Sequence, residues 1–101
     1  MYAVLRSTTG NKANETARLL EQNMAEMEKL FRSVRGFVSY SLVRTDDGTV
    51  SVSVFQDKTS ADEGSRVVLD WIKKNAPDLA PPAMSEGPVL ISIGPIQIGP
   101  I

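Results

Sequence analysis

The sequence predicts an α+β fold in which two helices cover one face of a four-stranded antiparallel sheet. Three observations predict it. The chain opens with a β-rich run, and a long segment follows with the apolar spacing of an amphipathic helix. Two further β-rich runs then flank a turn sequence, and a second helical segment comes after them. A last β-rich run completes the order β-α-β-β-α-β.

The first strand is expected over residues 2–7, where YAVLRS is rich in β-forming residues. A long helix is expected from Ala13 to Val34, because its apolar residues recur at spacings of four and three and so share one face. These residues are Ala13, Ala17, Leu20, Met24, Met27, Phe31 and Val34. Gly36 follows them as a natural helix terminator.

Residues 37–55 hold the most informative pattern, two β-rich runs on either side of Asp46-Asp47-Gly48. If those three residues form the loop, Thr45 pairs with Thr49 and the register of the hairpin is fixed. One face of the hairpin then carries Tyr40, Leu42, Val50, Val52 and Val54. The other face carries Phe37, Ser39, Ser41, Val43, Ser51, Ser53 and Phe55, so that four serines lie together on it.

The second helix is expected to begin at Ser60, which forms a capping-box pattern with Glu63, and to end before Pro77. Residues 77–88, PDLAPPAMSEGP, are rich in proline and are expected to form an irregular linker. The run VLISI, residues 89–93, is expected to be the fourth strand.

This order of elements is that of a ferredoxin-like plait, with residues 1–94 as a single domain. Such a plait leaves the second face of its sheet uncovered, and a second copy is an economical cover for a chain of 101 residues. We therefore expect a homodimer. The Gly-Pro-rich tail, residues 95–101, is expected to reach across to the partner subunit, because its isoleucines need a surface that buries them.

The composition excludes several classes of function. The chain has no cysteine and no histidine, which removes thiolate catalysis, zinc–sulfur sites and the commonest general base and haem ligand. The net charge is −1 and the charges are interspersed, so no basic stripe is present for nucleic acid. No apolar run approaches the ~18 residues that cross a bilayer, and the N-terminus lacks the regions of a signal peptide. We expect a cytoplasmic protein without a cofactor or metal, and with neither nucleic acid nor membrane as a partner.

Seven residues are candidates for lining a ligand pocket: Arg6, Ser39, Tyr40, Ser41, Ser51, Ser53 and Trp71. If the serine face meets the helices, the small side chains leave space and supply hydroxyl groups. If it faces solvent or a partner sheet, they are ordinary strand residues. Arg6, like Arg44 and Arg66, either holds an anionic substrate or is solvated or ion-paired. Tyr40 either donates a proton to a phenolate-like substrate or lies in the core.

Two residues of the second helix also allow two interpretations. Trp71 is the only tryptophan and lies on the apolar stripe of the helix, which favours a core residue. The alternative is a cavity wall whose indole N–H bonds a ligand or a carbonyl group. Gly64 costs roughly 1 kcal/mol relative to alanine inside a helix, which indicates close packing or room for a ligand.

The block of residues 36–75 resembles small bacterial proteins of the antibiotic biosynthesis monooxygenase-like superfamily, which have a dimeric α/β-barrel fold. The resemblance rests on GFVSY, the DDG turn, VSVSVFQD and the helix that ends in DWIKKN, and it extends over about residues 2–93. It implies a dimer in which two plaits pack sheet against sheet. The active members of that superfamily oxidise aromatic polyketides with dioxygen and without metal or flavin, or they degrade haem.

The chain departs from that family in specific places. The haem-degrading members use a histidine ligand, which is absent here, and an asparagine on the first strand, where this chain has Leu5 or Arg6. Their site tryptophan would fall near Gly64, so Trp71 does not match it, and no catalytic residue is carried over. The leading interpretation is a homodimeric cofactor-independent monooxygenase that acts on a small aromatic or quinol-like substrate. The alternatives are a non-catalytic ligand-binding or assembly protein, or an isomerase or decarboxylase, on the same fold.

Overall fold

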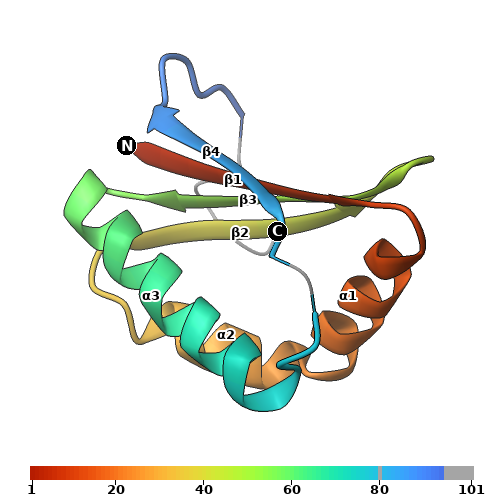
Figure 1. The fold of residues 1–101 in the computed structure, drawn as a ribbon. Helices are drawn as coiled ribbons and strands as arrows, with labels where there is room; N and C mark the ends of the chain where they lie inside the picture. Colours follow the sequence, from red (N-terminus) through yellow and green to blue (C-terminus); the bar gives the residue numbers. More distant parts are fainter. Residues whose placement is uncertain (80, 95–101) are drawn as a thin grey trace.

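The computed structural model describes residues 1–79 and 81–94, and it contains the predicted ferredoxin-like plait (Figure 1). Its elements are β1 (Tyr2–Thr9), α1 (Asn11–Gln22), α2 (Met24–Arg32), β2 (Phe37–Arg44), β3 (Gly48–Phe55), α3 (Lys58–Asn75) and β4 (Ala83–Pro88). All neighbouring strands are antiparallel, in the order β2-β3-β1-β4. The helices cover one face of the sheet, as Figure 1 shows. Within the described residues, no helix is long and apolar enough to cross a membrane.

The single first helix expected from Ala13 to Val34 is wrong, because the chain breaks it at Asn23 into α1 and α2. The side-chain amide of Asn23 donates to the Leu19 carbonyl group at 2.8 Å, a local bond that competes with helix continuation. The expected apolar face nevertheless continues across the break, since Ala13, Ala17, Met27, Phe31 and Val34 are all buried. Met24 is the exception, with 70% of its surface exposed.

The β2–β3 hairpin pairs one residue away from the expected register. Arg44, and not Thr45, lies opposite Thr49. Thr45 belongs to the turn, because its N–H donates to the Gly48 carbonyl group at 2.8 Å while its hydroxyl accepts from the Gly48 N–H at 3.1 Å. A β-bulge between Phe37 and Ser39 shifts the register again at the other end of the hairpin.

This change of register corrects the predicted faces, since a shift of one residue moves the side chains of a strand to the other face. The helix face of the hairpin carries Phe37, Tyr40, Leu42, Thr49, Ser51, Ser53 and Phe55. The open face carries Ser39, Ser41, Val43, Val50, Val52 and Val54. The predicted face with four serines therefore does not exist, because two serines lie on each side of the sheet.

The capping-box interpretation of α3 is also wrong. The helix begins at Lys58, and its cap is Asp57, whose carboxylate accepts from the Ser60 N–H at 2.8 Å. This hydrogen bond lowers the pKa of Asp57 below its ordinary value. At the other end of the helix, the Asn75 side chain donates to the Trp71 carbonyl group at 2.8 Å.

The fourth strand lies in the segment that was expected to be a linker, so the strand expected over residues 89–93 is wrong. β4 pairs with β1, and the ladder ends where the Val89 N–H donates to the Met1 carbonyl group at 2.9 Å. Because β1 starts there, the chain after Val89 runs past the end of its neighbouring strand. Three apolar side chains of this segment are 79–89% exposed: Leu90, Ile91 and Ile93. The tail of residues 95–101 lies outside the described residues, and its contact with a partner stays a prediction.

The helices pack on the sheet through one buried cluster that comprises Val4, Met27, Phe31, Val34, Phe55, Ala61, Val68 and Trp71. Gly64 lets α3 approach this cluster closely, since a Cβ atom there would lie 2.4 Å from Cζ of Phe55. Close packing is therefore the correct interpretation of Gly64. In the part of the chain that the structure describes, no helix lies over the opposite face of the sheet, where Leu5 and Val43 are 40% and 50% exposed.

We predict that Gly64→Ala lowers the free energy of unfolding by about 1–3 kcal/mol, the usual cost of overpacking a core. Alanine favours a helix by roughly 1 kcal/mol relative to glycine. The steric overlap of the alanine Cβ with Phe55 must therefore cost more than this gain in helix propensity. Urea unfolding followed by circular dichroism measures the difference. Thr59→Ala, at an exposed position of the same helix, is the control and should not destabilise. A Gly64→Ala variant as stable as the parent would contradict the packing described.

Candidate functional site

A cavity of about 260 Å³ lies between the helix face of the sheet and the helices, and we call it the inner cavity. β1, β2 and β3 supply its polar side chains, chief among them Arg6, Tyr40 and Ser51. α1, α2 and α3 supply mostly apolar walls: Leu20, Met27, Phe31, Val68, Leu69 and Ile72. Four residues between α3 and β4 also line the cavity: Pro77, Leu79, Pro81 and Pro82. An apolar space with a few convergent polar groups is the usual form of a small-molecule site.

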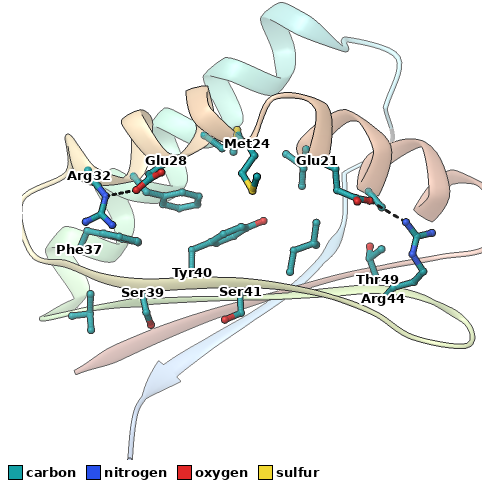
Figure 2. Close-up of a pocket in the computed structure, with 16 residues that line it drawn as sticks. Glu21, Met24, Glu28, Arg32, Phe37, Ser39, Tyr40, Ser41, Arg44 and Thr49 are labelled. Atoms are coloured by element: carbon teal, nitrogen blue, oxygen red, sulfur yellow. Dashed lines mark hydrogen bonds and ion pairs between the residues drawn. The ribbon is translucent and has the colours of Figure 1, made fainter. Parts of the chain in front are cut away.

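An open groove of about 720 Å³ runs between the free edge strand β2 and the helices α1 and α2, and we call it the edge groove (Figure 2). Six residues line both spaces: Leu20, Met27, Phe31, Tyr40, Leu42 and Thr49. The rings of Phe31 and Tyr40 stack within this shared wall, with their centroids 4.4 Å apart. The inner cavity and the edge groove are therefore adjoining spaces under one sheet, separated by these side chains.

Ion pairs flank the edge groove. A guanidinium nitrogen of Arg44 lies 3.1 Å from Glu21, which ties β2 to α1, and another donates to the Asn14 side chain at 3.0 Å. Arg32 pairs with Glu28 within α2 at 2.8 Å. Figure 2 shows both ion pairs on the rim of the groove. These charged groups are more than half exposed, so each pair contributes about 0–1 kcal/mol to stability.

Arg6 is a half-buried side chain of the inner cavity. It donates from Nη2 to the Ser65 hydroxyl at 2.7 Å, which links β1 to α3. Burial lowers the pKa of Arg6, an effect that the Tyr40 phenol and the Glu86 carboxylate partly offset. Within residues 1–79 and 81–94, no carboxylate oxygen lies within 4.0 Å of the guanidinium nitrogens of Arg6, so Arg6 forms no ion pair with these residues.

Tyr40 lines the inner cavity from β2, across β3 from Arg6. Burial raises the pKa of Tyr40, while a hydrogen bond with Ser51 and the positive charge of Arg6 act in the opposite direction. The phenol is therefore protonated near neutral pH and can donate a hydrogen bond to a ligand. Ser51 lies directly opposite Arg6 in the β1–β3 pairing. Arg6, Tyr40 and Ser51 form one polar cluster from three strands.

The structure separates the seven candidate residues into three groups. Arg6, Tyr40 and Ser51 come together at the inner cavity. Ser53 and Trp71 are 0% and 7% exposed and lie in the core. Among the described residues, the Ser53 hydroxyl and the Trp71 indole N–H have no hydrogen-bond partner. Ser39 and Ser41 point away from the helices, as Figure 2 shows, although their strand forms the border of the edge groove. The two arginines named as alternatives, Arg44 and Arg66, are exposed and ion-paired.

Sequence reasoning missed Ser65, which bonds Arg6 from α3. It also missed four polar residues that line the inner cavity: Thr8, Thr16, Thr49 and Lys73. Ser65 contacts Arg6 across 59 positions of sequence, a contact that no local pattern indicates. Lys73 lines the cavity from the last turn of α3, where its charge is explained equally well by the helix dipole. The one signal in the sequence was the spacing of Ser65 and Lys73. They are eight positions apart, or about two helical turns, which places them on the same side of α3.

The two inward-facing serines should respond differently to alanine substitution. Ser53→Ala removes a buried hydroxyl without a partner and should leave the free energy of unfolding unchanged or raise it by up to about 1 kcal/mol. Ser51→Ala removes the partner of Tyr40 and should lower it by about 1 kcal/mol. Chemical denaturation of the two variants and the parent gives both values. A clear loss of stability in Ser53→Ala, equal to that of Ser51→Ala, would contradict the assignment.

No protein-family model matches this chain, and no curated protein matches its sequence. Solved structures match it over nearly its full length. SnoaB, a cofactor-independent oxygenase from Streptomyces nogalater, aligns with a TM-score of 0.61 and 18% identity, over 91% of this chain and 94% of its own. The monooxygenase from the gene ActVA-Orf6 of Streptomyces coelicolor, in complex with nanaomycin D, aligns with a TM-score of 0.63 and 17% identity, over 93% and 90%.

A third match is a dimeric ferredoxin-like protein from an uncultured marine organism, with a TM-score of 0.65 and 9% identity, over 91% of this chain and 94% of that one. At these identities the likeness establishes the fold. It confirms, at the level of the fold, the resemblance that the sequence carries.

Proposed function

We propose that this chain, which has the fold of the antibiotic biosynthesis monooxygenase-like superfamily, binds a small aromatic or quinol-like molecule in its inner cavity and oxidises it with dioxygen without a cofactor. The observation that carries the proposal is the polar cluster of Arg6, Tyr40 and Ser51 in a cavity whose helix walls are mostly apolar. Two of the aligned structures are oxygenases by description, one of them cofactor-independent, which supports this choice of chemistry.

Such a reaction takes its electrons from the substrate. An anthrone or a quinol loses a proton to give an electron-rich anion, which reacts with dioxygen. In the anthrone case one oxygen atom becomes a carbonyl oxygen of the product and the other leaves as water. The positive charge of Arg6 would stabilise the substrate anion, and the protonated Tyr40 would donate a hydrogen bond to its oxygen. The apolar walls would exclude water from the reacting anion.

A second function, ligand binding without catalysis, is favoured by one specific observation. The described residues that line the inner cavity include no carboxylate, and the chain has no histidine. Tyr40 is protonated near neutral pH, so the lining offers no ready proton acceptor. An oxygenase of this design therefore depends on a substrate that loses its proton easily. A protein that only binds its ligand has no such requirement.

The oxygenase proposal predicts dioxygen uptake when the protein is mixed with anthrone, at a rate above that of the uncatalysed oxidation. Tyr40→Phe should lower kcat/KM by about tenfold or more, because it removes a hydrogen bond to the developing anion. The matched control is Tyr2→Phe, which deletes the same atom from a tyrosine outside the inner cavity, whose hydroxyl donates to Glu86 at 3.1 Å. Uptake no faster than the uncatalysed rate with both anthrone and a quinol would leave ligand binding as the function.

We also propose that the protein works as a homodimer joined through the open face of its sheet. That face carries Leu5, Val43, Val50, Val52 and Val54, with no helix over them. The exposed segment of Leu90, Ile91 and Ile93, and the tail of residues 95–101 beyond it, would lie against the partner subunit. The dimeric ferredoxin-like protein that aligns with this chain supports this arrangement.

The dimer proposal predicts that Val52→Glu, in the middle of the open face, converts the protein to a monomer. Burying a carboxylate in an apolar interface without a partner costs several kcal/mol. Analytical ultracentrifugation measures the association state. Thr59→Glu adds the same charge at an exposed site on α3 and should leave the dimer intact. A monomeric parent protein, or a dimeric Val52→Glu variant, would refute the proposed interface.

A further inference from the structure

We propose that the inner cavity selects its ligand by a carboxylate group, which Arg6 binds, and that the preferred ligands are small aromatic carboxylic acids. This inference rests on the proposed function in one respect only, that the inner cavity is the ligand site. It does not depend on oxidation.

The charges that line the inner cavity are all of one sign. Arg6 and Lys73 are the charged residues of the described lining, and no aspartate or glutamate joins them. Lys73 is exposed, whereas Arg6 is half-buried on the cavity floor. A neutral ligand would leave this excess of positive charge uncompensated in a space with apolar walls. An anionic ligand would neutralise it.

Arg6 also differs from the other arginines with known partners in this fold. Arg32, Arg44 and Arg66 are more than half exposed, and each pairs with a glutamate at 2.8–3.1 Å. Arg6 lies deeper, yet its hydrogen bond goes to the neutral hydroxyl of Ser65. Buried charges are normally paired, because desolvation without a counter-charge is costly. Arg6 is thus more buried than these three arginines, and within the described residues it has no carboxylate partner.

The carboxylate whose charge acts on Arg6, that of Glu86, is already engaged elsewhere. Glu86 raises the pKa of Arg6 through its charge. However, its Oε1 accepts from the Tyr2 hydroxyl at 3.1 Å and lies 3.8 Å from Nζ of Lys58. Burial dominates and holds the pKa of Arg6 below its ordinary value, which a bound anion would reverse.

The geometry suits a carboxylate in particular. The bond from Nη2 to Ser65 fixes the orientation of the guanidinium group, which has five N–H donors in a planar fork and keeps the rest for a ligand. A carboxylate accepts two parallel hydrogen bonds from such a fork. The protonated Tyr40 hydroxyl lies in the same polar cluster and supplies a further donor.

The remainder of the ligand must be apolar and small. Phe31, Val68 and Ile72 are among the walls of the inner cavity, and they favour an aromatic body. The volume of about 260 Å³ is below the range of about 300–1,000 Å³ that is typical of drug-sized ligands. One or two fused rings with a single carboxylate therefore match the space. A longer ligand would have to displace the Phe31–Tyr40 wall and extend into the edge groove.

The experiment compares 2-naphthoate with 2-naphthamide, a neutral probe of the same shape, by isothermal titration calorimetry at low salt. The parent protein should bind the carboxylate at least about tenfold more tightly than the amide, as expected for a charge-assisted bidentate contact. Arg6→Gln should abolish that preference. Arg66→Gln, which removes an arginine outside both spaces, should retain it. Arg6→Lys keeps the charge without the fork and should retain only part of it.

Equal binding of the two probes to the parent protein would overturn the inference, as would a preference that survives in Arg6→Gln. Failure of both 2-naphthoate and benzoate to bind at millimolar concentration would overturn it as well. Circular dichroism confirms that each variant is folded, and Arg6→Lys keeps the test decisive if Arg6→Gln is unstable. Dioxygen uptake is measured separately. Oxidation of anthrone without a carboxylate preference refutes only this inference, whereas a carboxylate preference without oxidation refutes only the oxygenase.

Discussion

The pairing of Arg44 with Thr49 decides which side chains of the sheet meet the helices. Side chains alternate along a strand, so this register turns Tyr40 and Leu42 to the same side as Ser51 and Ser53. It follows from the turn, in which Thr45 bonds Gly48 through both its backbone and its side chain. With Thr45 paired to Thr49 instead, β2 would present its serines to the helices and Tyr40 to the open face. The aromatic wall of the cavity would then be lost.

The small residues on the helix face explain why a cavity remains beneath α3. Ser51 and Thr49 are buried where valine or isoleucine would fill more space. Close contact between α3 and the sheet is secured elsewhere, at Gly64, where the helix packs directly on the ring of Phe55. Beyond that contact, the helix turns Ser65 toward Arg6 and lines the cavity with Val68, Ile72 and Lys73. The core is therefore tight at one end of α3 and open at the other.

The sequence predicted the parts of this fold that depend on local periodicity. The spacing of apolar residues identified the buried face of α1 and α2 except at Met24, and the order of elements predicted the plait. Features decided by long-range pairing were not predicted. The run VLISI has far stronger β propensity than AMSEGP, yet AMSEGP is the strand, because it is the segment that lies alongside β1. The one-residue error in the register likewise misplaced Ser39 and Ser41. It also set Tyr40 and Ser51 on opposite faces of the hairpin, whereas the structure turns both toward the inner cavity.

The central claim is that the ligand site lies on the helix side of the sheet, in the inner cavity. The most direct test is an isotope-filtered nuclear Overhauser spectrum of the uniformly ¹³C-labelled protein with unlabelled 2-naphthoate. We expect contacts from the ring protons of the ligand to the methyl groups of Leu42, Val68 and Ile72, which line the cavity. Contacts instead to the methyl groups of Val50, Val52 and Val54, on the open face of the same sheet, would contradict the account.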